Sequence, residues 1–394
     1  MGWGVRGPGA CPGDSANLLE LRAISNYRPK AARVRTSPRP GSWEDAVTSF
    51  HRREILGGLL ASGLLFGARA LAADERSAII DGAKREGALG FATSVSAAGF
   101  PLFMDAFRAK YPFIDTGSGY YSAPTGRVLA RVSAELDAGN LSFDVLHVAN
   151  LVPYLAMARS GQLLPYHSAE LAAFPDAAHG GDLWTTARVI GVIMAYNKNV
   201  LAPDKAPKSW ADMLKPEFSG SKLVIQDSAA GTTFNQMYLL ERLFGLDFMK
   251  QWAAQKPVIV ATAPQLIDLL VRGEALVGAT VDHFRAFEPD AVKSGIVGIY
   301  PTEGMPLAIA PVAIFKAAPH PNAARLFIDF TLSHEGSTLL AHDIFGVYSS
   351  RKDVPPPEGQ RPLAETNPLL PENLADYEAA SAHFPEHFDA LFKA

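Results

Sequence analysis

The stretch WTTARVIGVIMAYN (184–197) constrains the fold more than any other part of the sequence. It is one long extended stretch, and it is too long for one strand of a small parallel sheet. On either side of it, short apolar runs alternate with segments of helical periodicity, a pattern typical of βαβ units. We therefore expect 184–197 to be a crossover between two α/β lobes, with a second hinge crossover near 300–306.

The alternation before this crossover is regular. LGFATS (89–94) predicts a strand, and the helix after it has one apolar face made by Phe100, Phe103, Met104 and Phe107. The same pattern predicts strands over 114–121 and 142–149 and helices over 125–138 and 151–160.

A second alternation follows the crossover. It predicts strands over 222–227, 257–261, 275–281 and 306–315, and helices over 231–245, 246–255, 263–273 and 321–333. The expected fold is α/β, with each lobe a mostly parallel sheet covered by helices and the lobes joined by extended hinge crossovers. We expect lobe 1 to comprise 73–187 and 305–350, lobe 2 to comprise 188–304, and 351–394 to pack on the lobes.

The segment 47–72 has the features of an export signal. Paired arginines precede a glycine-rich apolar run, and two A-x-A steps predict cleavage after Ala70 or Ala72. The apolar run is too short for a membrane span. It resembles a twin-arginine signal, with the general secretory route as the alternative. The proline-rich segment 1–46 predicts a disordered extension, or one that is not translated if initiation occurs at Val47.

Charge and cysteine content exclude several classes of protein. The chain has 36 basic and 40 acidic residues; 10 basic and 5 acidic ones precede residue 73, which leaves a net charge of −9. An acidic chain of this kind does not favour nucleic acid as a partner. The only cysteine is Cys11, so the exported chain would have no disulfide and no cysteine nucleophile.

Three blocks of sequence resemble one family. They are TGRVLARVSAELDAGNLSFDVL, APKSWADMLKPEFSGSKLVIQDSAAGTTF and PLAIAPVAIFKAAPHPNAARLFIDFTLSHEGSTLLAHDIFGVYSSRKDV. Together they resemble extracellular solute-binding proteins of ABC importers, closest to the branch that includes ferric-ion binders. The resemblance covers about 75–355 and implies a two-lobe periplasmic-binding-protein architecture that closes on a small solute. It also implies an ABC permease in the inner membrane as partner, no cofactor, and a monomer.

Ligands of open α/β sheets bind outside the carboxyl ends of the strands, near helix N-termini. In lobe 1 this place predicts contacts from Thr93, Ser94 and Ser96, with a role of one serine as a helix cap alone as the alternative. The equivalent place in lobe 2 predicts contacts from Ser228, Ala229, Gly231 and Thr232.

A third group follows the strand 275–281. Asp282, His283 and Arg285 are candidates there, with a helix cap and a solvated charge as the alternative roles of the first and last. Ferric-ion relatives carry adjacent tyrosines in this neighbourhood, whereas here His283-Phe284-Arg285 stands.

Three candidates lie elsewhere. Tyr121 belongs to a tyrosine pair with Tyr120 in lobe 1, and Asn150 and Arg188 are weaker candidates.

The residues therefore predict a binding protein for a small oxyanion, such as a phosphorylated or carboxylated organic molecule. A ferric-ion carrier, a sensor subunit and a secreted enzyme on the same scaffold are the alternatives. HFPEH (383–387) has the spacing of one zinc-peptidase motif, but Pro385 breaks the helix which that motif requires. No catalytic residue and no metal ligand is expected.

Overall fold

The computed structural model describes residues 74–95, 100–117, 119–344 and 346–394. The predicted extension, the predicted signal and Ser96 lie outside these residues. In the part of the chain described, no helix has the length and apolarity needed to cross a bilayer.

The strands form one mixed sheet with the order β2-β1-β3-β9-β4-β7-β5-β6. Two sets of pairings are parallel: β1 pairs with β2 and β3, and β5 pairs with β6 and β7. The antiparallel pairings are those of β9 with β3 and β4, and of β4 with β7 and β8. The strands are β1 Phe91–Thr93, β2 Tyr120–Ser122, β3 Val145–His147, β4 Thr185–Asn197, β5 Leu223–Gln226, β6 Val258–Val260, β7 Val277–Asp282, β8 Ile296–Ile299, β9 Met305–Ile314 and β10 Pro368–Leu369.

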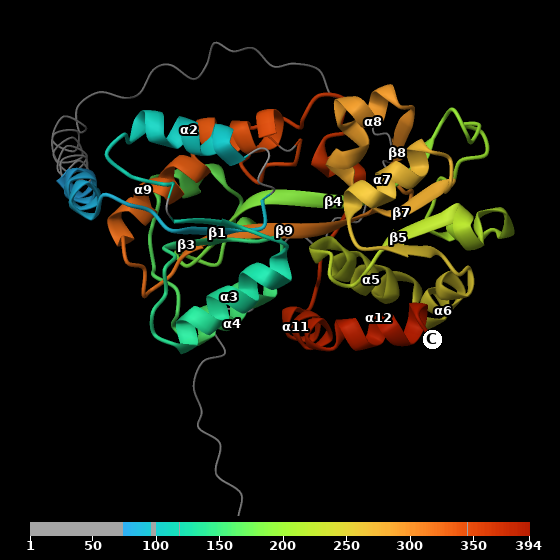
Figure 1. Cartoon of the computed structure of the whole chain (residues 1–394), viewed down its shortest axis with the longest axis horizontal. Coiled ribbons are helices and arrows are strands. Elements are labelled where there is room, and N and C mark those ends of the chain that lie inside the picture. Colours follow the sequence, from blue (N-terminus) through green and yellow to red (C-terminus); the bar gives the residue numbers. More distant parts are fainter. Residues whose placement is uncertain (1–73, 96–99, 118, 345) are drawn as a thin grey trace, which may run out of the picture. The chain divides into compact units, whose positions relative to one another are not determined.

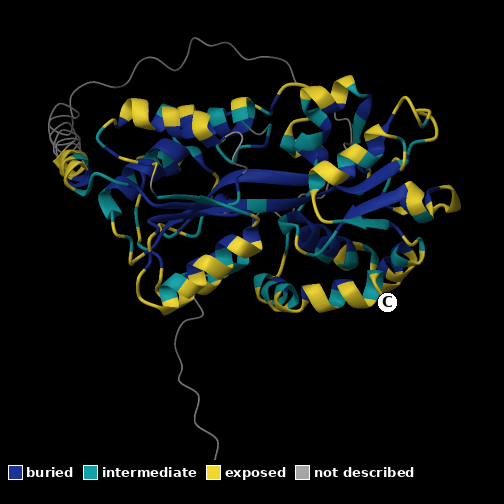
Figure 2. Ribbon diagram, in the orientation of Figure 1, coloured by how far each residue is buried: buried dark blue, intermediate teal, exposed yellow. Residues whose placement is uncertain are grey.

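The crossover strand β4 is buried at all its positions, as Figure 2 shows for the centre of the sheet. Its first half, Thr185–Gly191, pairs antiparallel with β9, and its second half pairs with β7 and β8. The predicted crossover over 184–197 is therefore confirmed. The second crossover is β9, so the hinge predicted near 300–306 lies at the beginning of a longer strand, Met305–Ile314.

Helices cover both faces of this sheet (Figure 1). They are α2 Phe100–Lys110, α3 Thr125–Asp137, α4 Val152–Arg159, α5 Gly231–Phe244, α6 Leu246–Ala254, α7 Ala263–Val271, α8 Pro289–Lys293, α9 Pro321–Leu332, α10 His334–Thr338, α11 Leu374–Ala382 and α12 Phe384–Phe392; residues 74–86 are also helical. The predicted apolar face of α2 is confirmed, since Phe100, Phe103, Met104 and Phe107 are its buried residues.

The hydrophobic core has a different extent on the two faces. One cluster packs α2 and α9 against β1 within lobe 1. A second cluster runs under both lobes, from Val128 on α3 and Tyr154 on α4 to Phe234 on α5 and Tyr377 on α11. Since burial of large apolar side chains is the main stabilising contribution, the second cluster holds the two lobes together on the face that carries α3, α4, α5 and α11.

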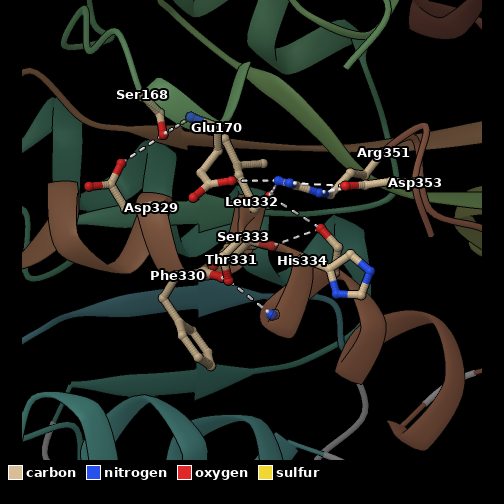
Figure 3. A network of polar contacts seen from close by, with 12 residues as sticks. Ser168, Glu170, Asp329, Phe330, Thr331, Leu332, Ser333, His334, Arg351 and Asp353 are labelled. Atoms are coloured by element: carbon tan, nitrogen blue, oxygen red, sulfur yellow. Dashed lines mark hydrogen bonds and ion pairs between the residues drawn. The ribbon is translucent and has the colours of Figure 1, made fainter. Parts of the chain in front are cut away.

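A polar network ties the end of lobe 1 together (Figure 3). The Arg351 side chain, 10% exposed, donates to Glu170 Oε2 at 2.5 Å, to the Leu332 carbonyl at 2.7 Å and to Asp353 Oδ1 at 2.7 Å. The Leu332 carbonyl is at the end of α9, where helical carbonyls lack an intrahelical partner. Arg351 thus fixes the return of the chain after α9 and α10.

Candidate functional site

Arg188 lies at the centre of the junction between the lobes. Its side chain is 4% exposed, and its Nε donates to His147 Nε2 at 3.0 Å. The β4–β9 pairing shifts register between Thr186 and Arg188, and such irregularities re-aim the side chains beside them. Burial lowers the pKa of Arg188 to about 10, and the neighbouring Asp282 carboxylate opposes that shift, so the guanidinium is charged at neutral pH. A buried cation thus stands between the two lobes.

His147, at the end of β3, is the residue that the sequence analysis missed. Burial lowers the pKa of His147 well below its usual value, and the charge of Arg188 lowers this pKa further. The ring is therefore neutral; because its Nε2 accepts from Arg188, its proton is on Nδ1. The one available signal was a lone histidine within the apolar run SFDVLHVA.

Asp282, at the end of β7, is the opposing group in lobe 2. Its Oδ1 accepts a hydrogen bond of 2.6 Å from the Thr232 hydroxyl, in the first turn of α5. Burial raises the pKa of Asp282, while the bond from Thr232 and the charges of Arg285 and Arg188 act against that rise. Asp282 therefore links the beginning of α5 to Arg188, and two of the predicted candidates, Thr232 and Asp282, are in direct contact.

The N-termini of α3 and α5 approach each other across the junction. A Cβ placed on Gly231 would lie 3.2 Å from Thr125 Oγ1, in the first turn of α3, and 3.2 Å from the Ala149 carbonyl oxygen. Neither helix has a side-chain cap: the residues before them are Pro124 and Ala230. Uncapped N–H groups and the positive ends of two helix dipoles thus meet at one place, an arrangement that favours an anion.

The predicted lobe 1 hydroxyls have structural partners. Thr93 is fully buried; its hydroxyl donates to the His147 carbonyl at 2.9 Å and accepts from Val95 N at 3.1 Å. Ser94 Oγ accepts from Ala149 N at 3.1 Å. These bonds hold the end of β1 to the end of β3, so the Thr93 hydroxyl is not presented to a ligand. The N-terminus that approaches α5 belongs to α3, which the sequence analysis did not single out.

Other candidates lie near the junction in supporting roles. Asn150 Oδ1 accepts from Val152 N at 2.9 Å in the first turn of α4. Asp227 Oδ1 accepts from Ala229 N at 2.9 Å, which shapes the turn that contains Ser228 before α5. The Arg285 guanidinium pairs with Glu288 Oε1 at 2.5 Å and lies over the Phe284 ring.

The expectation that His283 adds positive charge to a ligand site is wrong. Its ring is fully buried and stacked on Tyr348 with 4.5 Å between ring centroids. Burial lowers the pKa of His283 to about 3, so the ring is neutral at physiological pH. Its Nδ1 accepts from Gly191 N at 3.0 Å, at the residue where β4 exchanges one partner strand for another. His283 thus holds β4 at the point where it passes from β9 to β7.

The two tyrosines of β2 point away from each other, as successive strand residues do. The ring of Tyr120 stacks on Phe100 at 4.1 Å in the core cluster of α2 and α9. Tyr121 packs against the other cluster, beneath the Arg131 guanidinium at 4.4 Å. The two phenols therefore do not form a chelating pair. Within the described ranges, no group of three or more His, Cys, Asp or Glu side chains is placed to hold a metal ion.

Comparison with known proteins adds a family. A family model described as bacterial extracellular solute-binding protein matches residues 153–370. An uncharacterized protein of Haemophilus influenzae is 26% identical over 248 residues, which are 59% of this chain and 69% of that protein.

Solved structures share the fold. Iron-bound HitA from Pseudomonas aeruginosa matches with a TM-score of 0.66 at 20% identity, over 76% of this chain and 98% of that one. AfuA from Actinobacillus pleuropneumoniae, a periplasmic binding protein with fructose-6-phosphate bound, matches with a TM-score of 0.67 at 21% identity, over 78% and 99%. These likenesses confirm the predicted two-lobe α/β architecture.

Proposed function

The chain belongs to the bacterial extracellular solute-binding proteins, the binding components of ABC importers, and from this premise we propose that it captures a small organic anion between its lobes. The observation that carries the proposal is the approach of two uncapped helix N-termini, those of α3 and α5, beside the buried cation Arg188. The bound form, closed around the anion, is the one delivered to the permease.

The magnitudes are sufficient for tight binding. Each helix N-terminus contributes about 0.3–2 kcal/mol toward an anion, and each charge-assisted hydrogen bond about 1.5–3 kcal/mol. Two helix ends with three or four such bonds reach the roughly 8 kcal/mol of a micromolar dissociation constant. The net negative charge of the exported chain acts weakly against this, since the local field at the site dominates.

A phosphorylated sugar is the favoured class of anion. AfuA, with a similar fold, was solved with fructose-6-phosphate bound. A phosphate would lie between the N–H groups of α3 and α5, and Asp282 and Thr232 offer an acceptor and a hydroxyl for sugar hydroxyl groups beside it.

Ferric ion is the second candidate, since HitA was solved with iron bound. Ferric ion prefers anionic oxygen donors such as phenolates, and a pair of them must face one point. Tyr120 and Tyr121 belong to opposite core clusters, and phenolate formation at Tyr120 is disfavoured because burial raises its pKa. The anion is therefore the stronger proposal.

The remaining features fit an exported carrier that acts as a monomer without covalent chemistry. Residues 47–72 would direct export, by the twin-arginine route if the arginine pair is read, with cleavage after Ala70 or Ala72. Mass spectrometry of the secreted protein tests this directly; a product that retains 55–66 would contradict it.

The ligand class is tested with a thermal-shift panel on the chain expressed from residue 73. Fructose-6-phosphate, citrate and inorganic phosphate are compared with fructose, spermidine and ferric ion. A ligand at about 100 times its dissociation constant stabilises by about 2.7 kcal/mol, which shifts the melting temperature by several degrees. Stabilisation by ferric ion or fructose, with no response to any anion, would refute the proposal.

A further inference from the structure

Helix α11, Leu374–Ala382, which precedes α12, contacts both α4 of lobe 1 and α5 of lobe 2. Figure 1 shows α11 at the end of α5, with α12 continuing along α5 and α6. Helix α11 therefore bridges elements that any separation of the lobes must move apart.

On the lobe 2 side, α11 is held by buried contacts of Tyr377 and by more exposed polar contacts of Asp376. The Tyr377 hydroxyl donates to Asn235 Oδ1 at 2.6 Å, and its ring lies 4.8 Å from that of Phe234. The neighbouring Asp376 accepts from the Tyr238 hydroxyl at 2.7 Å and pairs with Arg242. All four partners are on α5.

One of these contacts leads to the candidate site. Asn235 Nδ2 donates to the Gly231 carbonyl at 3.1 Å. Gly231 is the first residue of α5 and faces Thr125 and Ala149 of lobe 1. A chain of two hydrogen bonds thus joins Tyr377 to the helix end that would hold the anion.

On the lobe 1 side, α11 makes one exposed ion pair. Glu378 pairs with Arg159 in the last turn of α4; their side chains are 25% and 62% exposed. Consecutive helix residues point about 100° apart, so Asp376, Tyr377 and Glu378 reach three different partners from one turn. The polar contacts to α5 include the buried Tyr377–Asn235 hydrogen bond, whereas the polar contact described between α11 and α4 is the exposed Glu378–Arg159 pair.

We propose that α11 positions the binding site: it fixes the first turn of α5 through Tyr377 and Asn235, and it restrains lobe opening through Glu378 and Arg159. On opening, α11 stays with α5 and releases Arg159, because the buried contacts are the stronger ones. That the α5 turn holds an anion rests on the proposed function, whereas the restraint on opening does not.

The restraint is tested without ligand, so that its failure is distinct from a failure of the proposed function. The exported chain has no cysteine, so spin labels can be placed on cysteines introduced at the exposed Leu102 of lobe 1 and Val292 of lobe 2. In Glu378→Arg, the fraction of molecules that show the longer label distance of the open form should rise about two- to fivefold. This is the range expected for the loss of one exposed ion pair.

The exchanged pair provides the decisive comparison. Arg159→Glu combined with Glu378→Arg should restore the wild-type distance distribution. Glu386→Arg on α12 makes the same change of charge at an exposed residue and should have no effect. If the exchanged pair opens the lobes as much as Glu378→Arg alone, or if Glu386→Arg opens them equally, the restraint is refuted.

The positioning role is tested by hydrogen exchange. Tyr377→Phe keeps the ring but leaves Asn235 Oδ1 without its donor, so the amides of 233–235 should exchange about fivefold faster, the equivalent of one hydrogen bond. Tyr238→Phe removes the hydrogen bond from Tyr238 of α5 to Asp376 of α11. This bond does not connect to Gly231, so the variant should leave the exchange of these amides unchanged. Equal acceleration by both variants, or by neither, would overturn the assignment.

Discussion

Each lobe has a buried histidine, one at the end of β3 and one directly after β7, that accepts a hydrogen bond from crossover strand β4. In lobe 1, His147 accepts from Arg188 Nε at 3.0 Å; in lobe 2, His283 accepts from Gly191 N at 3.0 Å. Burial lowers the pKa of both rings, so both are neutral acceptors at physiological pH. The donors differ: one is a charged side chain and the other is a backbone amide.

This difference between the donors suits the two histidines to different tasks, one at the candidate site and one at the crossover strand. A guanidinium has several N–H groups, so Arg188 can bond His147 and still act on Asp282 or on an anion. A backbone N–H has one direction, so the bond to His283 holds Gly191 itself, where β4 passes from β9 to β7. Two histidines in similar surroundings thus support different tasks, and the donor decides which.

The largest effect is expected from Arg188→Met, which removes the group shared by both lobes. It leaves His147 without its donor and Asp282 with Arg285 as its remaining neighbouring cation, and we expect a loss of about 3–5 kcal/mol in the free energy of unfolding. Arg188→Met combined with Asp282→Asn should recover part of this loss. Urea denaturation measures both; a loss no larger than that of the exposed control Arg272→Met would contradict the central role of Arg188.

The second prediction concerns pH and compares the two histidines directly. The folded-state pKa of His283, about 3, lies below its ordinary 6.5, so the unfolded chain binds the proton first as pH falls. The free energy of unfolding therefore keeps its full value above pH 6.5. As the pH falls toward 3, it decreases by about 1.4 kcal/mol per pH unit for each buried histidine.

Variants test how much each histidine contributes to this dependence of the free energy of unfolding on pH. His283→Asn and His147→Gln each keep an acceptor where the ring nitrogen stood, and each should reduce the slope between pH 6 and pH 4.5 by one proton. Urea midpoints measured across this range provide the slope. If it is unchanged in both variants, the acid sensitivity comes from other groups.

The third prediction compares the two helix ends. Gly231→Val places methyl groups against Thr125 and Ala149, so the lobes should not close fully and anion affinity should fall at least tenfold, or about 1.4 kcal/mol. Gly126→Val makes the same change in α3, where nothing lies within 4 Å of an added Cβ, and should lower affinity by less because it does not hold the lobes apart. Calorimetric titration with fructose-6-phosphate measures both; equal losses would mean that α5 does not face lobe 1.

The smallest effect is expected when substitutions at two threonines are compared for stability and affinity. Thr93→Val removes two buried hydrogen bonds within lobe 1 and should cost about 1–2 kcal/mol of stability without changing affinity. Thr232→Val removes the donor to Asp282 and should change affinity as well as stability. Chemical denaturation and titration of both variants test the contrast, and a loss of affinity in Thr93→Val would break it.

Much of the fold could be predicted from the sequence because its signals are local. The apolar face of α2 and the long extended run of β4 set the helix, the crossover and the two-lobe alternation without knowledge of distant contacts. The strand ends were less certain: the expected strand 114–121 is only Tyr120–Ser122 in the structure. Short strands carry little periodicity, so their limits depend on their partners.

The site was predictable only in part, since it depends on contacts between distant residues. Thr232 and Asp282 were expected, but the hydrogen bond between them joins residues fifty positions apart. Thr93 and Thr232 occupy similar strand-to-helix turns, and no local signal shows that one hydroxyl bonds a neighbouring strand and the other a carboxylate. His147 was missed for the same reason, because its partner Arg188 comes from another strand.

The place of β9 in the sheet has a consequence for the order in which the chain can fold. β9 lies between β3 and β4, yet it is synthesised after all of lobe 2. Until Met305–Ile314 emerges, β3 and the first half of β4 have no common partner, so the sheet of lobe 1 stays interrupted while lobe 2 can already form. Pairings between segments so far apart in sequence slow folding. The last third of the chain therefore decides when the first third becomes structured.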